Sequence, residues 1–172
     1  DSLSPVFEWY TDWGMFIFYA FFIALLAYGV RHKRALFKQA GLAYVFAQVF
    51  GTFLLVRLVK IGCGRPRPNV ATMHDALCQM PSFAHAFNSF PSSHAANVAV
   101  GAMFVFLLLR SRVAALLALA AALLMALARI AIGEHYLSDV LAGLALGVAI
   151  AAVVTRVYLL PRWRAIGTGA TQ

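Results

Sequence analysis

The chain has 172 residues, of which 63% are hydrophobic and only 12% are charged. Ordinary soluble domains carry about 25% charged residues, and a soluble core of this size cannot hide so much apolar surface. The net charge is +8, but many of the cations stand in short segments between long apolar stretches, where they orient membrane spans. The composition therefore excludes an ordinary soluble domain, and we expect no nucleic-acid partner.

Apolar stretches of the length that crosses a bilayer define the architecture. A hydrocarbon core about 30 Å thick is crossed by roughly 20 helical residues. Five stretches meet or approach that length, and the third is the shortest: residues 13–30, 40–59, 95–109, 113–132 and 136–160. We therefore expect an all-α fold, a polytopic transmembrane helical bundle of about five spans that forms one membrane-embedded domain over residues 1–172.

Positive charges at the span ends predict the orientation. They fall in the first loop, in the third loop and after the last span: Arg31, Lys33, Arg34, Lys38, Arg110, Arg112, Arg162 and Arg164. The positive-inside rule makes that side cytoplasmic. We therefore expect the N-terminus outside and the C-terminus in the cytoplasm. Residues 1–12 are then an outer interfacial segment, and residues 60–91 are an outer loop.

Two cysteines, Cys63 and Cys78, share this outer loop. An oxidising compartment permits a Cys63–Cys78 disulfide, and their spacing matches no zinc-ligand pattern. A free pair and a bridged pair both fit the sequence.

Small and polar residues inside the spans indicate close helix packing. We expect Gln48 and Thr52 to hydrogen-bond to a neighbouring helix, and we interpret Gly143 and Gly147, four residues apart, as an intramolecular close-packing face.

Ionisable residues gather at the outer ends of the spans, where they predict a functional site. They are Lys60, Arg67, His94, Arg129, His135 and Asp139. Three of them are fixed cations, which suit the three non-bridging oxygens of a phosphoryl group. The site that this pattern predicts binds a tetrahedral anion.

The segment Pro91–His94 and the pair His135 and Asp139 supply the remaining chemistry. Ser92 and Ser93 stand at the start of a helix, where unpaired backbone N–H groups favour an anion. His135 and Asp139 are four residues apart and share a helix face, so the carboxylate can orient an imidazole whose other nitrogen stays free. His94 is then placed to donate a proton to a leaving oxygen.

Three other charged residues near this cluster receive simpler interpretations. We interpret Arg57 and Arg65 as interfacial or headgroup-contacting residues, and Glu134 as a solvated turn residue in preference to a substrate contact.

The order and spacing of these motifs resemble a known family. Lys60-x6-Arg67-Pro68, Pro91-Ser92-Ser93-His94 and Arg129-x5-His135-x3-Asp139 resemble the three-part signature of the type 2 phosphatidic acid phosphatase superfamily, the integral-membrane lipid phosphate phosphatases. The resemblance implies that His135 is the nucleophile, that Asp139 orients it and that His94 protonates the leaving group. It implies that Lys60, Arg67, Ser92, Ser93 and Arg129 bind phosphate, and it implies no metal or other cofactor.

The sequence departs from that family in three places. Ser93 stands where the family usually has Gly, Ala128 stands where it usually has Ser, and five spans replace the usual six. We expect any additional span to precede the matched region. None of these differences removes a catalytic group.

These motifs predict a lipid phosphatase with a phosphohistidine intermediate at the outer face of a bacterial inner membrane. Phosphatidic acid, phosphatidylglycerophosphate, polyprenyl diphosphate and lipid A 1-phosphate all offer the required phosphoryl group. A lipid-to-lipid phosphotransferase with the same intermediate is an alternative. An anion transporter or channel is another, although it gives no reason for Asp139 to stand one turn from His135. The sequence leaves the substrate and the oligomeric state open.

Overall fold

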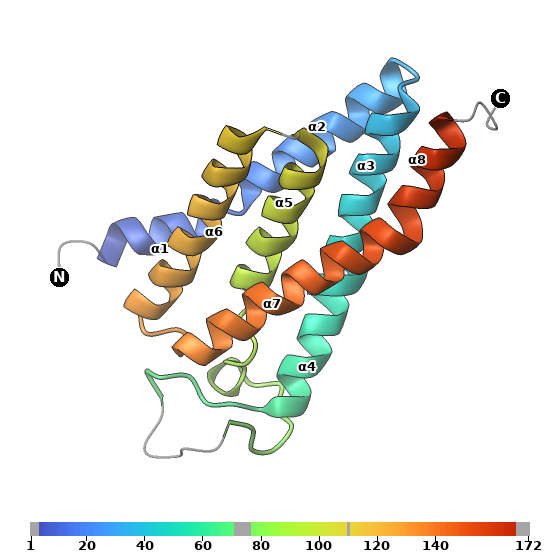
Figure 1. Cartoon of the computed structure of the whole chain (residues 1–172). Helices are drawn as coiled ribbons and strands as arrows, with labels where there is room; N and C mark the ends of the chain where they lie inside the picture. The colour runs from blue at the N-terminus through green and yellow to red at the C-terminus, as the bar shows by residue number, and fades with distance from the viewer. Residues whose placement is uncertain (1–3, 71–76, 110, 168–172) are drawn as a thin grey trace.

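The computed structural model describes residues 4–70, 77–109 and 111–167, and every regular element within them is a helix (Figure 1). Arg110, which contributed to the predicted orientation, and residues 71–76 of the predicted outer loop lie outside the described residues. The elements are α1 (Ser4–Trp13), α2 (Phe16–Arg31), α3 (Ala35–Phe46), the π-helical η1 (Ala47–Leu55), α4 (Val56–Cys63), the short 3-10 helix η2 (His85–Phe87), α5 (Ser93–Leu109), α6 (Arg112–Ala131), α7 (Leu137–Val154), the π-helical η3 (Thr155–Leu159) and α8 (Leu160–Gly167).

The predicted spans correspond to these helices. Among the residues that the structure describes, four helical stretches are long and apolar enough to cross a membrane: Pro5–Arg31, Ala35–Cys63, Arg112–Ala131 and Leu137–Gly167. The third predicted span is α5, an apolar helix that is shorter than the others. The first and last stretches extend beyond the predicted spans, because α1 continues into α2 and because η3 and α8 continue α7.

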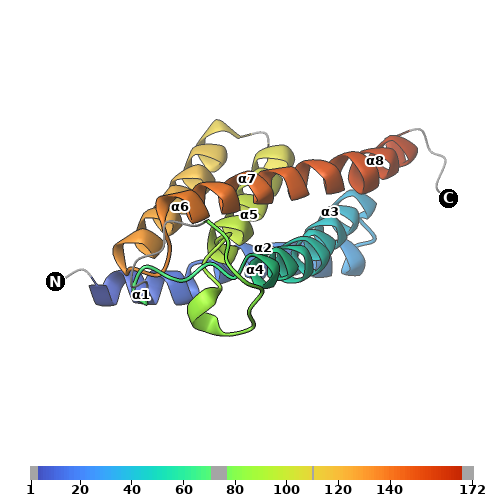
Figure 2. The same ribbon diagram turned by 90° about the horizontal axis from the view of Figure 1, so that it is seen from below.

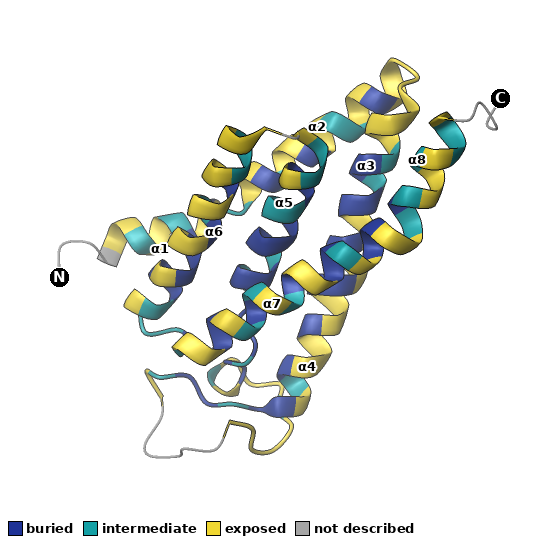
Figure 3. Ribbon diagram, viewed as in Figure 1, coloured by how far each residue is buried: buried dark blue, intermediate teal, exposed yellow. Residues whose placement is uncertain are grey.

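Large apolar side chains cover the outside of the bundle. Phe53 is 77% exposed and Val157 is 73% exposed, and many other Leu, Val and Phe side chains are exposed along the helices (Figure 3). An apolar surface of this extent is stable in lipid rather than in water. The chain is therefore a polytopic helical membrane protein, as its composition predicted.

Helix α5 lies at the centre of the bundle, between α6 and α7 on one side and α2 and α4 on the other (Figure 2). Its contact with α7 depends on glycine. A Cβ at Gly143 would overlap the carbonyl oxygen of Ser92, and a Cβ at Gly147 would overlap the carbonyl oxygen of Ala96. The intramolecular packing predicted for the two glycines is therefore confirmed.

A polar network links three helices inside the bundle. The side chain of Asn97 on α5 accepts hydrogen bonds from Tyr19 on α2 at 2.8 Å and from Thr52 on η1 at 3.0 Å. Gln48 donates to the backbone carbonyl of Asn97 at 3.3 Å. The cross-helix bonds predicted for Gln48 and Thr52 are present, and they satisfy polar groups that lipid cannot.

The two ends of the bundle differ. The segment between α4 and α5 and the turn between α6 and α7 lie at one end, which we call the site end (Figure 1). The turn between α2 and α3, the start of α6 and helix α8 lie at the opposite end, together with most of the cations that predicted the orientation.

A disulfide closes the site-end segment. Cys63, the last residue of α4, is bonded to Cys78, fifteen residues later. The backbone N–H of Gln79 donates to the carbonyl of Cys63 at 2.9 Å, so the chain returns to the end of α4 at this point. Of the two states that the sequence allowed, the structure has the bridged one.

We predict that the double variant Cys63→Ser/Cys78→Ser is less stable than the parent protein. A crosslink across about 15 residues contributes about 3 kcal/mol in the chain-entropy model. The measurement is the thermal unfolding midpoint in detergent, which should fall by several degrees. A reducing agent should lower the midpoint of the parent to that of the variant and leave the variant unchanged. Equal midpoints for the oxidised parent and the variant would show that the bridge does not stabilise the fold.

Candidate active site

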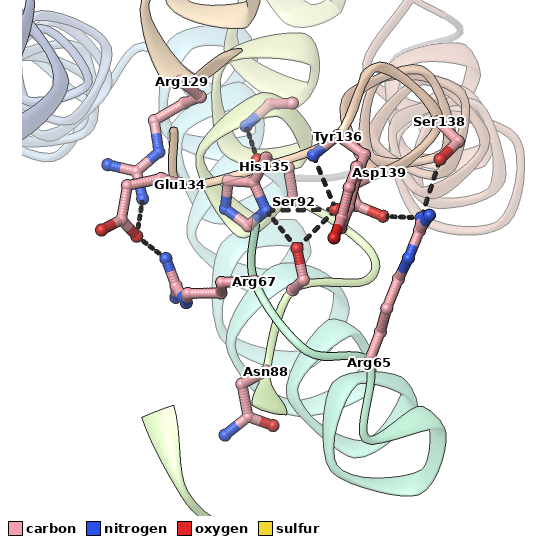
Figure 4. Close-up of polar contacts among 12 residues, drawn as sticks. Arg65, Arg67, Asn88, Ser92, Arg129, Glu134, His135, Tyr136, Ser138 and Asp139 are labelled. Atoms are coloured by element: carbon pink, nitrogen blue, oxygen red, sulfur yellow. Dashed lines mark hydrogen bonds and ion pairs between the residues drawn. The ribbon is translucent and has the colours of Figure 1, made fainter. Parts of the chain in front are cut away.

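Three segments that are far apart in the sequence meet at the site end through backbone hydrogen bonds. The N–H of Ser92 donates to the carbonyl of Asp139 at 2.9 Å, and the N–H of Ser89 donates to the carbonyl of Arg65 at 3.0 Å. These bonds join the segment before α5 to the start of α7 and to the segment after α4. All three predicted motifs therefore converge on one place (Figure 4).

His135 and Asp139 face each other at the start of α7. Asp139 is fully buried, and its Oδ2 accepts a hydrogen bond from the backbone N–H of Tyr136 at 3.0 Å, which fixes the carboxylate at the helix terminus. The Nδ1 atom of His135 lies 3.7 Å from the same oxygen. The two side chains therefore share a face as predicted, but they are too far apart for a direct hydrogen bond.

Ser89 lies between the side chains of His135 and Asp139. Its hydroxyl donates to Asp139 Oδ2 at 2.5 Å, and its Oγ lies 3.4 Å from His135 Nδ1. Ser89 is fully buried. Sequence reasoning missed this residue, because Ser89 lies outside the three motifs and reaches Asp139 only through the tertiary fold.

The imidazole of His135 is kept neutral. Burial lowers the pKa of His135 from 6.5 to about 4, the carboxylate of Asp139 opposes this shift, and the nearby charges of Lys60, Arg129 and Arg67 reinforce it. At neutral pH the ring therefore carries one proton. With that proton on Nδ1, facing Ser89 and Asp139, the Nε2 lone pair is free to react.

Two buried arginines lie beside this pair and share a carboxylate. Arg67 and Arg129 are 5% and 7% exposed, and both contact Oε2 of Glu134; the distance from Arg129 Nη2 is 3.1 Å. The interpretation of Glu134 as a solvated turn residue is therefore wrong. Its position directly before His135, among cations that need a counter-charge, was the signal that could have found it.

Arg65 also belongs to the cluster. Its guanidinium contacts Oδ1 of Asp139, donates to the hydroxyl of Ser138 at 2.7 Å and lies over the ring of Tyr136, 4.1 Å from its centroid. The interpretation of Arg65 as an interfacial residue is therefore wrong. Arg65 and Arg67 stand two residues apart, a spacing that places both side chains on one side of the chain wherever the backbone is extended. This spacing could have indicated that both point inward.

The side chain of Lys60 contacts the segment that precedes α5. Its buried ammonium group donates to the carbonyl of Asn88 at 2.5 Å and to that of Ser89 at 3.4 Å. An ammonium group has three N–H donors. Two of them hold the backbone that carries Ser89, and one remains for a ligand.

The start of α5 brings the remaining predicted residues to the same place. Ser92 is buried, and its hydroxyl accepts a hydrogen bond from the N–H of Ala95 at 3.4 Å. Ser93 and His94 are half-buried on the first turn. Within the described part of the chain, the side chains of Ser93 and His94 take part in none of the hydrogen bonds or ion pairs of the cluster, so both remain available to a ligand.

Similarity to known proteins agrees with this site. The family model described as the PAP2 superfamily matches residues 38–163. A lipid A 1-phosphatase from Rhizobium etli is 41% identical over 107 residues, which cover 61% of this chain and 45% of that protein. A lipid A 1-phosphatase from Rhizobium johnstonii is also 41% identical over 107 residues, covering 61% of this chain and 43% of that protein. The chain thus spans less than half the length of these two relatives.

A solved structure shares the fold. The crystal structure of the first transmembrane PAP2 type phosphatidylglycerolphosphate phosphatase, from Bacillus subtilis, superposes with a TM-score of 0.67. The sequences are 23% identical, and the match covers 91% of this chain and 76% of the other. The family match spans well over half of the chain and includes all three site motifs, so the chain belongs to the PAP2 superfamily.

Proposed function

We propose that this chain hydrolyses a lipid phosphomonoester or diphosphate through a phosphohistidine intermediate. The observation that carries the proposal is the convergence of His135, Ser89 and Asp139 with the buried guanidinium groups of Arg67 and Arg129 at one end of a membrane bundle. A neutral imidazole with a free nitrogen is a nucleophile, and buried guanidinium groups bind phosphoryl oxygens.

In the first half of the proposed reaction, Nε2 of His135 attacks phosphorus and the bond from phosphorus to the lipid oxygen breaks. His94 donates a proton to the departing oxygen. The cations Arg67, Arg129 and Lys60 stabilise the negative charge on the non-bridging oxygens, as do the backbone N–H group of Ser93 and the hydroxyls of Ser92 and Ser93. The lipid alcohol, or the lipid monophosphate from a diphosphate, is released.

In the second half, His94 takes a proton from water, and the resulting hydroxide attacks the phosphohistidine. The phosphorus–nitrogen bond breaks, and inorganic phosphate leaves. The positive charge that the phosphorylated ring of His135 carries is balanced by Asp139 through the hydroxyl of Ser89. Fixed cations supply the charge stabilisation in this scheme, so we expect turnover in the presence of EDTA.

We propose that the site end faces the exterior of a bacterial inner membrane. Two independent features support this orientation. The cations at the opposite end mark a cytoplasmic side by the positive-inside rule, and the Cys63–Cys78 bridge at the site end needs an oxidising compartment. Lipid A 1-phosphate is a candidate substrate, since two relatives bear the name lipid A 1-phosphatase.

The proposal predicts phosphate release by the purified protein. We would assay it in EDTA with phosphatidic acid, phosphatidylglycerophosphate, polyprenyl diphosphate and lipid A 1-phosphate, and with a labelled lipid acceptor to detect transfer. At least one lipid should yield inorganic phosphate, and His135→Ala should lower the rate by about 1,000-fold or more, as loss of a nucleophile does. Turnover that persists in His135→Ala, or no turnover of any lipid, would contradict the proposal.

The bridging position of Ser89 generates a second prediction. Ser89→Ala should lower kcat/KM by up to about 100-fold, because His135 loses its link to Asp139 and small misplacements of a catalytic group cost that much. Ser138→Ala is the matched control, since its hydroxyl contacts Arg65 but not Asp139. That control should stay within about three-fold of the parent. Ser89→Ala should also be less stable than the parent by about 1–3 kcal/mol, because the buried Asp139 loses a hydrogen bond, so kinetics are compared at a temperature where both variants are folded. Equal kinetics for the two would show that Ser89 has no part in the reaction.

A further inference from the structure

Glu134 occupies the place where the proposed mechanism puts the substrate's phosphoryl oxygens. Its Oε2 atom is shared by Arg67 and Arg129, two of the three cations assigned to phosphate (Figure 4). The residue lies in the turn between α6 and α7, directly before the proposed nucleophile. In the absence of substrate, the protein therefore places a negative charge of its own in the anion site.

A carboxylate fills this site less completely than a phosphoryl group would. Two guanidinium groups present ten N–H donors, whereas Glu134 offers two oxygens and a single negative charge. In the described part of the chain, the buried Nε of Arg129 has no hydrogen-bond partner. A phosphomonoester brings three non-bridging oxygens and up to two negative charges, so it can satisfy donors that Glu134 leaves unused.

The position of Glu134 allows it to leave the arginines. Its side chain is 22% exposed, while the side chains of Arg67 and Arg129 are 6% and 8% exposed. The carboxylate can therefore move to water without crossing the packed core. The guanidinium group of Arg67 cannot move as easily, since its Nε donates to the carbonyl of His85 at 3.0 Å and the backbone N–H of Arg67 donates to the carbonyl of Ala86 at 2.9 Å.

We propose that Glu134 is a displaceable occupant of the phosphate site, which competes with substrate and product for Arg67 and Arg129 and so lowers the affinity of the site for phosphate. This inference rests on the proposed function. The substrate phosphoryl group displaces Glu134 from the arginines. After the phosphorus–nitrogen bond is hydrolysed, the carboxylate returns and assists the release of inorganic phosphate.

A structural role makes the opposite prediction. If Glu134 only held the two guanidinium groups in position, its removal would leave them mutually repelled and less ordered, and phosphate binding would weaken. The direction of the change in phosphate affinity therefore separates competition from positioning.

The test is the binding of inorganic phosphate and of vanadate to Glu134→Gln, measured by calorimetry and by inhibition of turnover. Removal of a competing charge should tighten phosphate binding by about ten-fold, with a lower KM for the lipid and a lower kcat because product leaves more slowly. Glu134→Asp keeps the charge on a shorter stem and should lie between parent and Glu134→Gln. If Glu134→Gln does not fold, the phosphate affinity of Glu134→Asp still tests the inference.

Gln79→Lys is the charge-matched control. It raises the net charge by the same single unit on an exposed residue of the site-end segment, without removing the carboxylate from the arginines. Its phosphate affinity should stay within about two-fold of the parent. Equal tightening in this control would assign the effect to net charge and overturn the inference. Unchanged or weaker phosphate binding in Glu134→Gln would overturn it as well. The calorimetric measurement needs no turnover, so failure of every lipid as a substrate would reject the proposed function separately.

Discussion

Burial of several charges at the end of a membrane bundle is the constraint on which the site depends. Lys60, Arg67, Arg129 and Asp139 are each at most 7% exposed, and a buried charge is tolerated only when it is paired or hydrogen-bonded. The structure meets this requirement with Glu134 between two arginines, with Arg65 and Ser89 on Asp139, and with backbone carbonyls on Lys60. These partners offset the cost of burying the charges that the proposed chemistry uses.

Close helix packing brings those charges together. Gly143 lets α7 approach the carbonyl of Ser92, and the N–H of Ser92 is bonded to the carbonyl of Asp139. These two contacts therefore hold the start of α5 close to the start of α7 and leave little room for the helices to shift. A larger residue at position 143 would separate the two helix starts, so the packing of the bundle and the geometry of the site depend on the same contact.

Much of the fold and the motif residues could be predicted from the sequence because their signals are local. Span length predicted the helices, and fixed spacing placed His135 and Asp139 on one face. Glu134 and Arg65 carried only weak signals in their neighbours along the chain and Ser89 carried none, because the partners of all three lie on other segments. Ion pairs such as Glu134 with Arg67 exist only once the turn before α7 meets the segment after α4.

Transfer of the phosphoryl group to His135 is the step on which the proposed reaction depends. It can be observed by mass spectrometry of purified protein quenched during turnover of a lipid phosphate. We expect phosphate on His135 in the parent and none at that position in His135→Ala. If the protein releases phosphate steadily but never carries it on His135, under conditions that preserve an acid-labile phosphohistidine, then His135 is not the nucleophile.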